Sequence, residues 1–278
     1  MKRIVIALFA ALTALSAAAG NVTKSFDKLS QFTGIQVSDA FKINLVQGDE
    51  YTATVTIDSA LEEYLDVAVI GKVLYVRLKD RDIKTTIRNI GKRKMEATVT
   101  CPALSQIHLT GTASLSSSDK WVSPMEKFTL ELTGASKADK LRLESGEIKV
   151  ILGDAANAGI NGDFQIVEAI LSGASVLTMT GDYGDVTATA EDASKASFIG
   201  TADTIEATCT ATSFLDALEL KTSEASVECS GASKANVYVN DKFEIELNGA
   251  SNCRYRSDNE SLNVIPSVSR ASSLKRIH

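Results

Sequence analysis

The sequence carries acidic side chains in a pattern that could serve carbohydrate chemistry. Polysaccharide hydrolases and lyases place two or three carboxylates on one face of adjacent strands, for acid–base catalysis or for metal binding. Four acids lie about ten residues before a recurrent serine: Glu126, Asp185, Asp203 and Asp241. The positions three residues after each serine show no acidic cluster, since they read Asp139, Thr178, Ser197, Asp216, Asn236 and Arg254. Aspartate at turns explains the four acids more simply, so an enzyme is the alternative here and not the prediction.

Motifs for metals, cofactors and nucleophiles are missing. The two histidines, His108 and His278, are far apart in the chain. The chain has no GxSxG, HExxH, P-loop or dinucleotide-binding fingerprint, and it lacks the glycine nonapeptide of a calcium-binding ladder. We therefore predict no catalytic residues, no cofactor and no metal site.

Basic residues are concentrated in one segment. Residues 77–94 hold eight bases against Asp80 and Asp82, a net charge of +6, whereas residues 119–250 hold 22 acids and 10 bases, a net charge of −12. The whole chain carries −6 at pH 7, which argues against nucleic acid as the main partner. We predict that the basic segment is an anionic-ligand patch for envelope polysaccharide or surface glycan, with protection of a sheet edge as the alternative. Its members are Arg77, Lys79, Arg81, Lys84, Arg88, Lys92, Arg93 and Lys94.

A short string of small residues, Gly-Ala-Ser in its best copies, recurs about every 20 residues. Its final serines are Ser114, Ser136, Ser175, Ser194, Ser213, Ser233, Ser251 and Ser272. The one double gap, of 39 residues, spans a degenerate copy near Ala155 and Ala156. Turn chemistry explains the string, because Gly permits a left-handed corner and Ser bonds to nearby backbone or to the next Ser. We interpret the serines as structural, with a row of ligand-binding serines as the alternative.

Each repeat alternates apolar and polar residues with period two, as in Phe128, Leu130 and Leu132, which is typical of half-buried strands. Strands at a fixed period of about 20 residues predict a β-solenoid, in which each coil buries its apolar side by stacking on its neighbours. Roughly eight coils spaced by about 4.8 Å form a rod of roughly 40 Å. The residues four positions before each serine should form one buried column: Leu132, Leu171, Ala190, Cys209, Cys229, Leu247 and Val268.

Four cysteines allow disulfides in an exported protein. Cys209 and Cys229 are 20 residues apart, which is one coil, so their Cα atoms should lie within disulfide range. Side chains in a parallel ladder point the same way, however, and this separates the Cβ atoms too far. We predict four buried thiols, with Cys253 facing inward and Cys101 unpaired.

The first residues are typical of a secretory signal peptide, with a basic start, an apolar stretch from Ile4 to Leu15 and an Ala-x-Ala site. We expect residues 1–19 to be removed, which leaves no segment able to span a membrane.

Residues 20–278 then form the mature domain, with an N-terminal β part (20–104) that begins or caps the Gly-Ala-Ser repeat solenoid (105–278). A helical turn is expected near residues 60–65. The predicted location is the periplasm or the cell surface.

The strings FTGIQVS (32–38), INLVQGD (43–49), the repeated SGAS and the closing SVSRASSLK (267–275) resemble the bacterial auto-transporter adhesin family with a head GIN domain. The resemblance covers roughly residue 26 to the C-terminus. It implies a right-handed parallel β-helix in a surface or periplasmic setting, although Asp192 and Arg270 stand where the family usually has Gly. We predict an exported, non-enzymatic β-solenoid that acts as an adhesin-like or cell-envelope binding module of unknown ligand. The alternative is a carbohydrate-active β-helix enzyme, a polysaccharide lyase or hydrolase.

Overall fold

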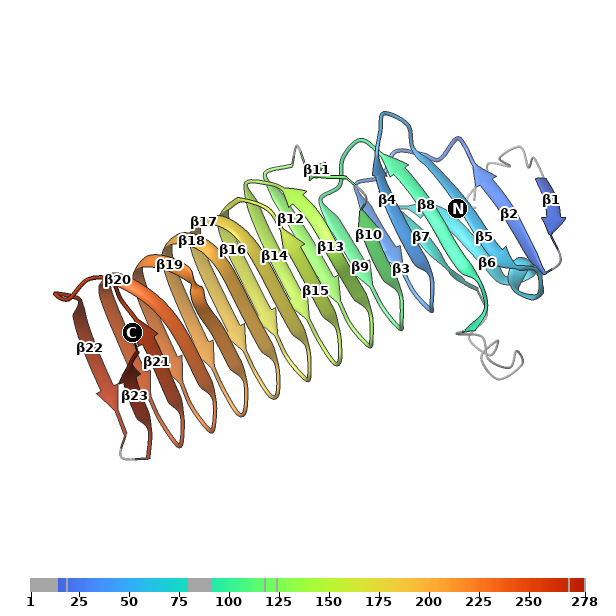
Figure 1. The fold of residues 1–278 in the computed structure, drawn as a ribbon. Helices are drawn as coiled ribbons and strands as arrows, with labels where there is room; N and C mark the ends of the chain where they lie inside the picture. The colour runs from blue at the N-terminus through green and yellow to red at the C-terminus, as the bar shows by residue number, and fades with distance from the viewer. Residues whose placement is uncertain are drawn as a thin grey trace, which may run out of the picture.

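The strands stack into a single rod, with the N-terminal strands at one end and β22 and β23 at the other (Figure 1). The computed structural model describes residues 15–18, 20–79, 92–117, 119–123, 125–269 and 271–277. It is a β-solenoid of about eight turns with coils of about 20 residues, which confirms the predicted fold. Among these residues no helix has the length and hydropathy needed to cross a membrane.

The N-terminal end of the rod is closed by antiparallel strands. Its elements are β1 (Leu15–Ala18), β2 (Asn21–Phe26), β3 (Gly34–Val37), β4 (Lys42–Gln47), β5 (Thr52–Asp58), the 3-10 helix η1 (Ser59–Tyr64), β6 (Leu65–Ile70), β7 (Val73–Leu78) and β8 (Met95–Cys101). Strand β5 pairs antiparallel with β2 and β8, and β6 pairs antiparallel with β7. These pairings cover the free edge of the first coil. Helix η1 is the predicted turn, and β1 lies in the predicted signal peptide.

The remaining strands pair in parallel and build the regular coils. They are β9 (Gln106–Leu109), β10 (Ser114–Ser117), β11 (Trp121–Val122), β12 (Lys127–Leu132), β13 (Lys137–Glu144), β14 (Glu147–Leu152), β15 (Asn157–Asn161), β16 (Phe164–Leu171), β17 (Val176–Ala190), β18 (Lys195–Cys209), β19 (Phe214–Cys229), β20 (Lys234–Leu247), β21 (Asn252–Arg256), β22 (Asn263–Val268) and β23 (Ser273–Arg276). The coils do not all follow chain order, because β3 lies between β7 and β9, and β4 lies between β8 and β10.

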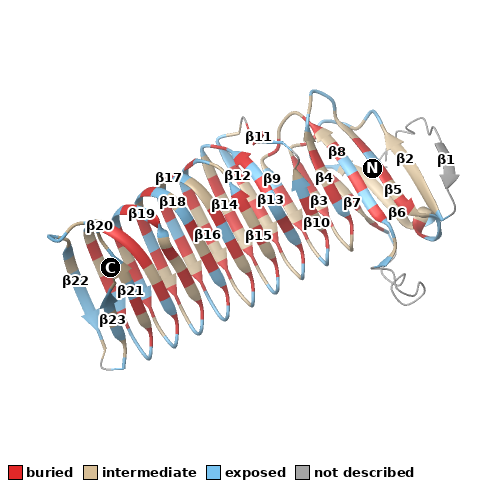
Figure 2. Ribbon diagram, in the orientation of Figure 1, coloured by how far each residue is buried: buried red, intermediate tan, exposed pale blue. Residues whose placement is uncertain are grey.

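The Gly-Ala-Ser corner divides the outer surface into two faces. The pre-corner face is formed by β7, β3, β9, β12, β14, β16, the C-terminal halves of β17–β20, and β22. The post-corner face is formed by β5, β8, β4, β10, β13, β15, the N-terminal halves of β17–β20, β21 and β23. On both faces inward residues alternate with outward ones, as the bands of buried and exposed residues show (Figure 2).

The predicted apolar column is confirmed except at its end. Leu132, Leu171 and Leu247 are fully buried, and Cys209 and Cys229 are 1% and 2% exposed. These residues are register partners in one continuous row of strands. Val268 is 43% exposed, contrary to the prediction. It lies in the terminal strand β22, which pairs only with β20 among the described strands, so no further coil covers it.

The corners are uniform although their residues are not. Each described corner has one residue with φ between 55° and 74°: Asp39, Gly111, Gly134, Asp154, Gly173, Asp192, Ala211, Gly231 and Gly249. Asp tolerates this left-handed region better than most residues. The carboxylate of Asp192 also accepts a hydrogen bond of 2.9 Å from the backbone N–H of Gly173, one coil earlier. Asp192 therefore forms the same corner as the glycines, while Arg270 lies outside the described residues.

The corner serines are structural, as predicted, because they point inward. Six of them are at most 1% exposed: Ser136, Ser175, Ser194, Ser213, Ser233 and Ser251. The Ser233 hydroxyl donates to the carbonyl of Cys209 at 3.0 Å. The first copy is shifted by one residue, since buried Ala113 takes the serine position and Ser114 faces outward opposite Lys137. The degenerate copy places buried Ala156 in the same column.

All four cysteines are free and buried, as predicted. Burial raises the pKa of the Cys101 thiol to about 12, and burial also raises the pKa of Cys253. Cys209 and Cys229 are register partners. The hydrogen bond between their thiols raises the pKa of Cys209, and burial raises it further. The same hydrogen bond lowers the pKa of Cys229. Burial shields all four thiols from reagents in the folded protein.

Candidate functional site

The described part of the basic segment lies at the N-terminal end of the rod, where β7 ends and β8 begins. Four of its five described members are in ion pairs: Arg77 with Asp66 at 3.0 Å, Lys79 with Asp66 at 3.7 Å, Arg93 with Asp58 at 2.9 Å, and Lys94 with Glu96 at 3.1 Å. Lys92 is exposed. Arg81, Lys84 and Arg88 lie outside the described residues. The segment remains a predicted anionic-ligand patch, but most of its described charge is offset by neighbouring carboxylates.

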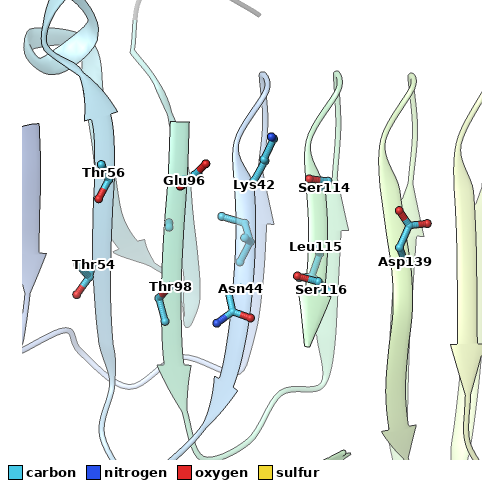
Figure 3. A pocket seen from close by; sticks show the side chains of 12 residues that line it. Lys42, Asn44, Thr54, Thr56, Glu96, Thr98, Ser114, Leu115, Ser116 and Asp139 are labelled. Carbon is cyan, nitrogen blue, oxygen red and sulfur yellow. The ribbon is translucent and has the colours of Figure 1, made fainter. Parts of the chain in front are cut away.

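A polar trough opens beside this segment on the post-corner face. Its volume is about 450 Å³. Strands β5, β8, β4, β10 and β13 lie side by side there, and their outward side chains project to one side (Figure 3). The lining comprises Lys42, Ile43, Asn44, Thr54, Thr56, Glu96, Ala97, Thr98, Ser114, Leu115, Ser116 and Asp139.

Strand alternation sets the trough's chemistry. The apolar residues of these strands, such as Ile43 and Leu115, face the core and are 2% and 1% exposed. Their neighbours in sequence face outward and form two rows across the strands. One row runs Thr56, Glu96, Lys42 and Ser114, and the other runs Thr54, Thr98, Asn44 and Ser116. Hydroxyl, amide and charged side chains at the regular spacing of a sheet can exchange hydrogen bonds with the hydroxyls of a sugar chain, both as donors and as acceptors.

Sequence reasoning missed the lysines on this face. Lys42, Lys137, Lys195 and Lys234 are exposed, and each is the first residue of a strand after a corner. A sequence signal was present, because the string Ala-Ser-Lys occurs at residues 135–137, 193–195 and 232–234. We refer to these four residues as the post-corner lysines.

Acidic side chains gather at another edge of the coils. A hollow of about 550 Å³ is lined by residues from β11, the turn between β13 and β14, β16, β17 and β18, and four of them are Glu144, Asp163, Asp182 and Asp203. The Asp163 carboxylate accepts the backbone N–H of Asp182 at 3.0 Å, and the Asp182 carboxylate accepts the Thr201 hydroxyl at 2.7 Å.

Tyr183 adjoins these acids and is 6% exposed. Its hydroxyl has no hydrogen-bond partner among the described residues. Burial, together with the charges of Asp163 and Asp182, raises its pKa.

The acids singled out from the sequence do not form one cluster. Asp203 lines the hollow, whereas Asp185 points outward from β17 and accepts the Thr204 hydroxyl at 2.7 Å. Within the described ranges, no group of three or more His, Cys, Asp or Glu is arranged to hold a metal ion.

Comparison with known proteins places these features in a family. The family model described as "putative auto-transporter adhesin, head GIN domain" matches residues 31–258. A putative adhesin from Parabacteroides distasonis has a TM-score of 0.68 and 15% identity, and one from Parabacteroides merdae has a TM-score of 0.64 and 15% identity. A protein described as a putative lipid binding protein from P. distasonis has a TM-score of 0.59 and 16% identity. All three alignments cover 94% of this chain and 98% of the other. None of the curated proteins compared with the chain matches it.

Proposed function

The chain belongs to the family of putative auto-transporter adhesins with a head GIN domain. On that premise we propose that it is an exported, non-enzymatic, adhesin-like module that binds envelope polysaccharide or surface glycan in the polar trough. Export is supported by the signal-peptide pattern of residues 1–19. The single observation that carries the proposal is the double row of outward polar side chains across β5, β8, β4 and β10.

The trough suits a sugar chain more than a compact charged ligand. Most of its outward side chains are uncharged hydroxyls and amides, with Lys42, Glu96 and Asp139 as its charged groups. Central strands hold these side chains in fixed register, so few rotamers need ordering when a ligand binds. A surface of this kind binds by many modest hydrogen bonds along an extended ligand.

The test is binding of the purified protein to an array of neutral and acidic bacterial glycans. The trough variant is Asn44→Ala, Thr98→Ala and Ser116→Ala combined. The matched control is Thr187→Ala, Thr189→Ala and Thr208→Ala, three outward threonines of the pre-corner face. We expect at least about tenfold weaker binding for the trough variant, since each of the three lost hydrogen bonds contributes about 0.5–1.5 kcal/mol, and no change for the control. Absence of binding by the wild type, or equal binding by both variants, would contradict the proposal.

The location is tested separately. Protease treatment of intact cells, with a periplasmic protein as the internal standard, distinguishes the surface from the periplasm. We expect cleavage in intact cells, because an adhesin must reach its ligand, whereas resistance until the outer membrane is opened would place the protein in the periplasm.

The acidic hollow supports a second candidate, a carbohydrate-active enzyme. Asp163 and Asp182 occupy adjacent coils, so their backbones lie about 4.8 Å apart, and paired carboxylates at short range serve glycoside hydrolysis. Incubation with linear polysaccharides and measurement of new reducing ends tests it. Our proposal predicts no release, whereas release by the wild type that is lost in Asp163→Asn and Asp182→Asn would establish the enzyme.

A further inference from the structure

The post-corner lysines form one straight row along the rod. An unbroken chain of register partners joins them: Lys42, Ser114, Lys137, Asn157, Val176, Lys195, Phe214 and Lys234. Successive positions are about 4.8 Å apart, so the lysines are separated by about 10, 14 and 10 Å and extend over about 34 Å. Four cations thus lie in one extended outward column.

None of the four post-corner lysines forms an ion pair within the part of the chain that the structure describes. The Nζ of Lys195 lies over the ring of Phe214, 5.3 Å from its centroid. On the pre-corner face, by contrast, Lys127 pairs with Glu147, Lys149 with Glu168 and Lys242 with Glu244, at 3.8, 2.7 and 2.7 Å. The pre-corner lysines are therefore engaged within the protein, whereas the post-corner lysines remain available to a partner.

Protection of a sheet edge does not explain the row. Lysine blunts strands whose hydrogen-bonding groups are free, but β13 pairs with β10 and β15, and β18 pairs with β17 and β19. Lys137 and Lys195 thus lie on central strands, where no edge needs protection.

The residues between the lysines suit a sugar chain. Ser114 and Asn157 supply hydroxyl and amide groups, and the partly exposed ring of Phe214 offers an apolar surface. The neighbouring outward row includes two carboxylates of the repeat, Asp139 and Asp216, and Asp216 accepts a bond from the Asn236 amide at 3.4 Å. Cationic, acidic and neutral groups therefore alternate on this face, which suits a carbohydrate that carries both carboxylates and hydroxyls.

We propose that the post-corner lysines bind a linear anionic polysaccharide that lies along the rod axis and enters the polar trough at Lys42. This inference rests on the proposed function and extends it, because it names the charge class of the glycan and the direction of the bound chain. The acidic groups of the polysaccharide then pair with the lysines, whereas the rest of the acidic solenoid repels anions. The protein should therefore select polymers that can follow the row of lysines.

The experiment measures binding of polygalacturonate, a linear polyuronate, to the immobilised protein, with neutral dextran as the reference polymer. The test variant is Lys137→Gln, Lys195→Gln and Lys234→Gln combined. The control is Lys127→Gln, Lys149→Gln and Lys242→Gln, which removes the same number of charges from the pre-corner face. We expect about tenfold weaker binding for the test variant, at most about twofold for the control, and weaker binding by the wild type at higher salt. Equal losses in the two variants, or no loss in either, would overturn the inference.

Two further measurements separate the possible failures. If the lysine variant binds like the wild type while the trough variant loses binding, the proposed function stands and the lysine row is excluded. If the wild type binds single-stranded DNA of matched charge as tightly as polygalacturonate, the row responds to charge alone and the assignment to a glycan is wrong. Thermal unfolding of both lysine variants should match the wild type, because all six side chains lie on the outside of the sheets.

Discussion

Replacement of Leu171 by Ala tests whether the assigned register of the coils is correct. Leu171 ends strand β16, is fully buried, and lies between Leu152 and Ala190 in the apolar column. The substitution removes three carbon atoms from the core, which costs about 2.4 kcal/mol at about 0.8 kcal/mol per buried methylene. The small side chain of Ala190 cannot fill the space that remains, so a cavity term adds to this cost. We expect a total loss of about 3–4 kcal/mol.

The matched control is Ile166→Ala in the same strand. Ile166 is 44% exposed and lies five residues before Leu171, on the opposite side of the strand. Its truncation also removes three carbon atoms, but they are roughly half exposed and leave no internal cavity, so we expect a smaller loss of about 1 kcal/mol.

The assay is urea unfolding followed by circular dichroism. The dependence of the unfolding free energy on urea should be the same for both variants, because the surface exposed on unfolding is nearly unchanged. Equal losses for the two variants, or a Leu171→Ala protein within about 0.5 kcal/mol of the wild type, would refute the register.

Three other predictions follow from the core and the corners. At pH 8 the folded protein should not react with a thiol reagent, whereas the chain unfolded without reductant should show four reactive thiols; two or none would indicate disulfides. Folded Cys101, with a pKa of about 12 against an ordinary value of 9.0, keeps a proton that the unfolded chain loses, so stability should fall as the pH rises from about 9. Cys101→Ala should make the fall of stability with pH less steep, and an unchanged dependence on pH would show that Cys101 does not cause the fall. Gly181→Ala would place a Cβ 1.9 Å from the carbonyl oxygen of Gly162 and should cost at least about 3 kcal/mol in thermal or urea unfolding. Gly153→Ala, whose nearest neighbour would be 3.7 Å away, should be tolerated, and equal stability of the two variants would contradict the close stacking of the coils.

The repeat predicted the solenoid because one local requirement recurs in every coil. Each coil needs a left-handed corner and an inward small side chain, and Gly-Ala-Ser supplies both, as at Gly173 and Ser175. The spatial order of the strands in the first coils could not be predicted from the sequence in the same way. Strand β3 pairs with both β7 and β9, and its alternation of Ile35 and Val37 suits either neighbour equally.

The candidate site illustrates a different limit. Charge density along the sequence drew attention to the basic segment, but Asp58 and Asp66 come from other strands and pair with its arginines only in the folded chain. The post-corner lysines are dispersed in sequence and meet only through the coil register. For Lys137, Lys195 and Lys234 the signal is a lysine directly after the corner serine, and it becomes readable once the corner is known to direct the next residue outward.

The central claim is that an acidic glycan lies along the post-corner face. Acetylation of the lysines with a water-soluble reagent, read by mass spectrometry with and without polygalacturonate, tests it most directly. We predict several-fold slower acetylation of Lys42, Lys137, Lys195 and Lys234 when the polymer is bound, and unchanged rates for Lys127, Lys149 and Lys242. Uniform protection of all lysines, or protection confined to Lys92 and Lys94, would contradict the account.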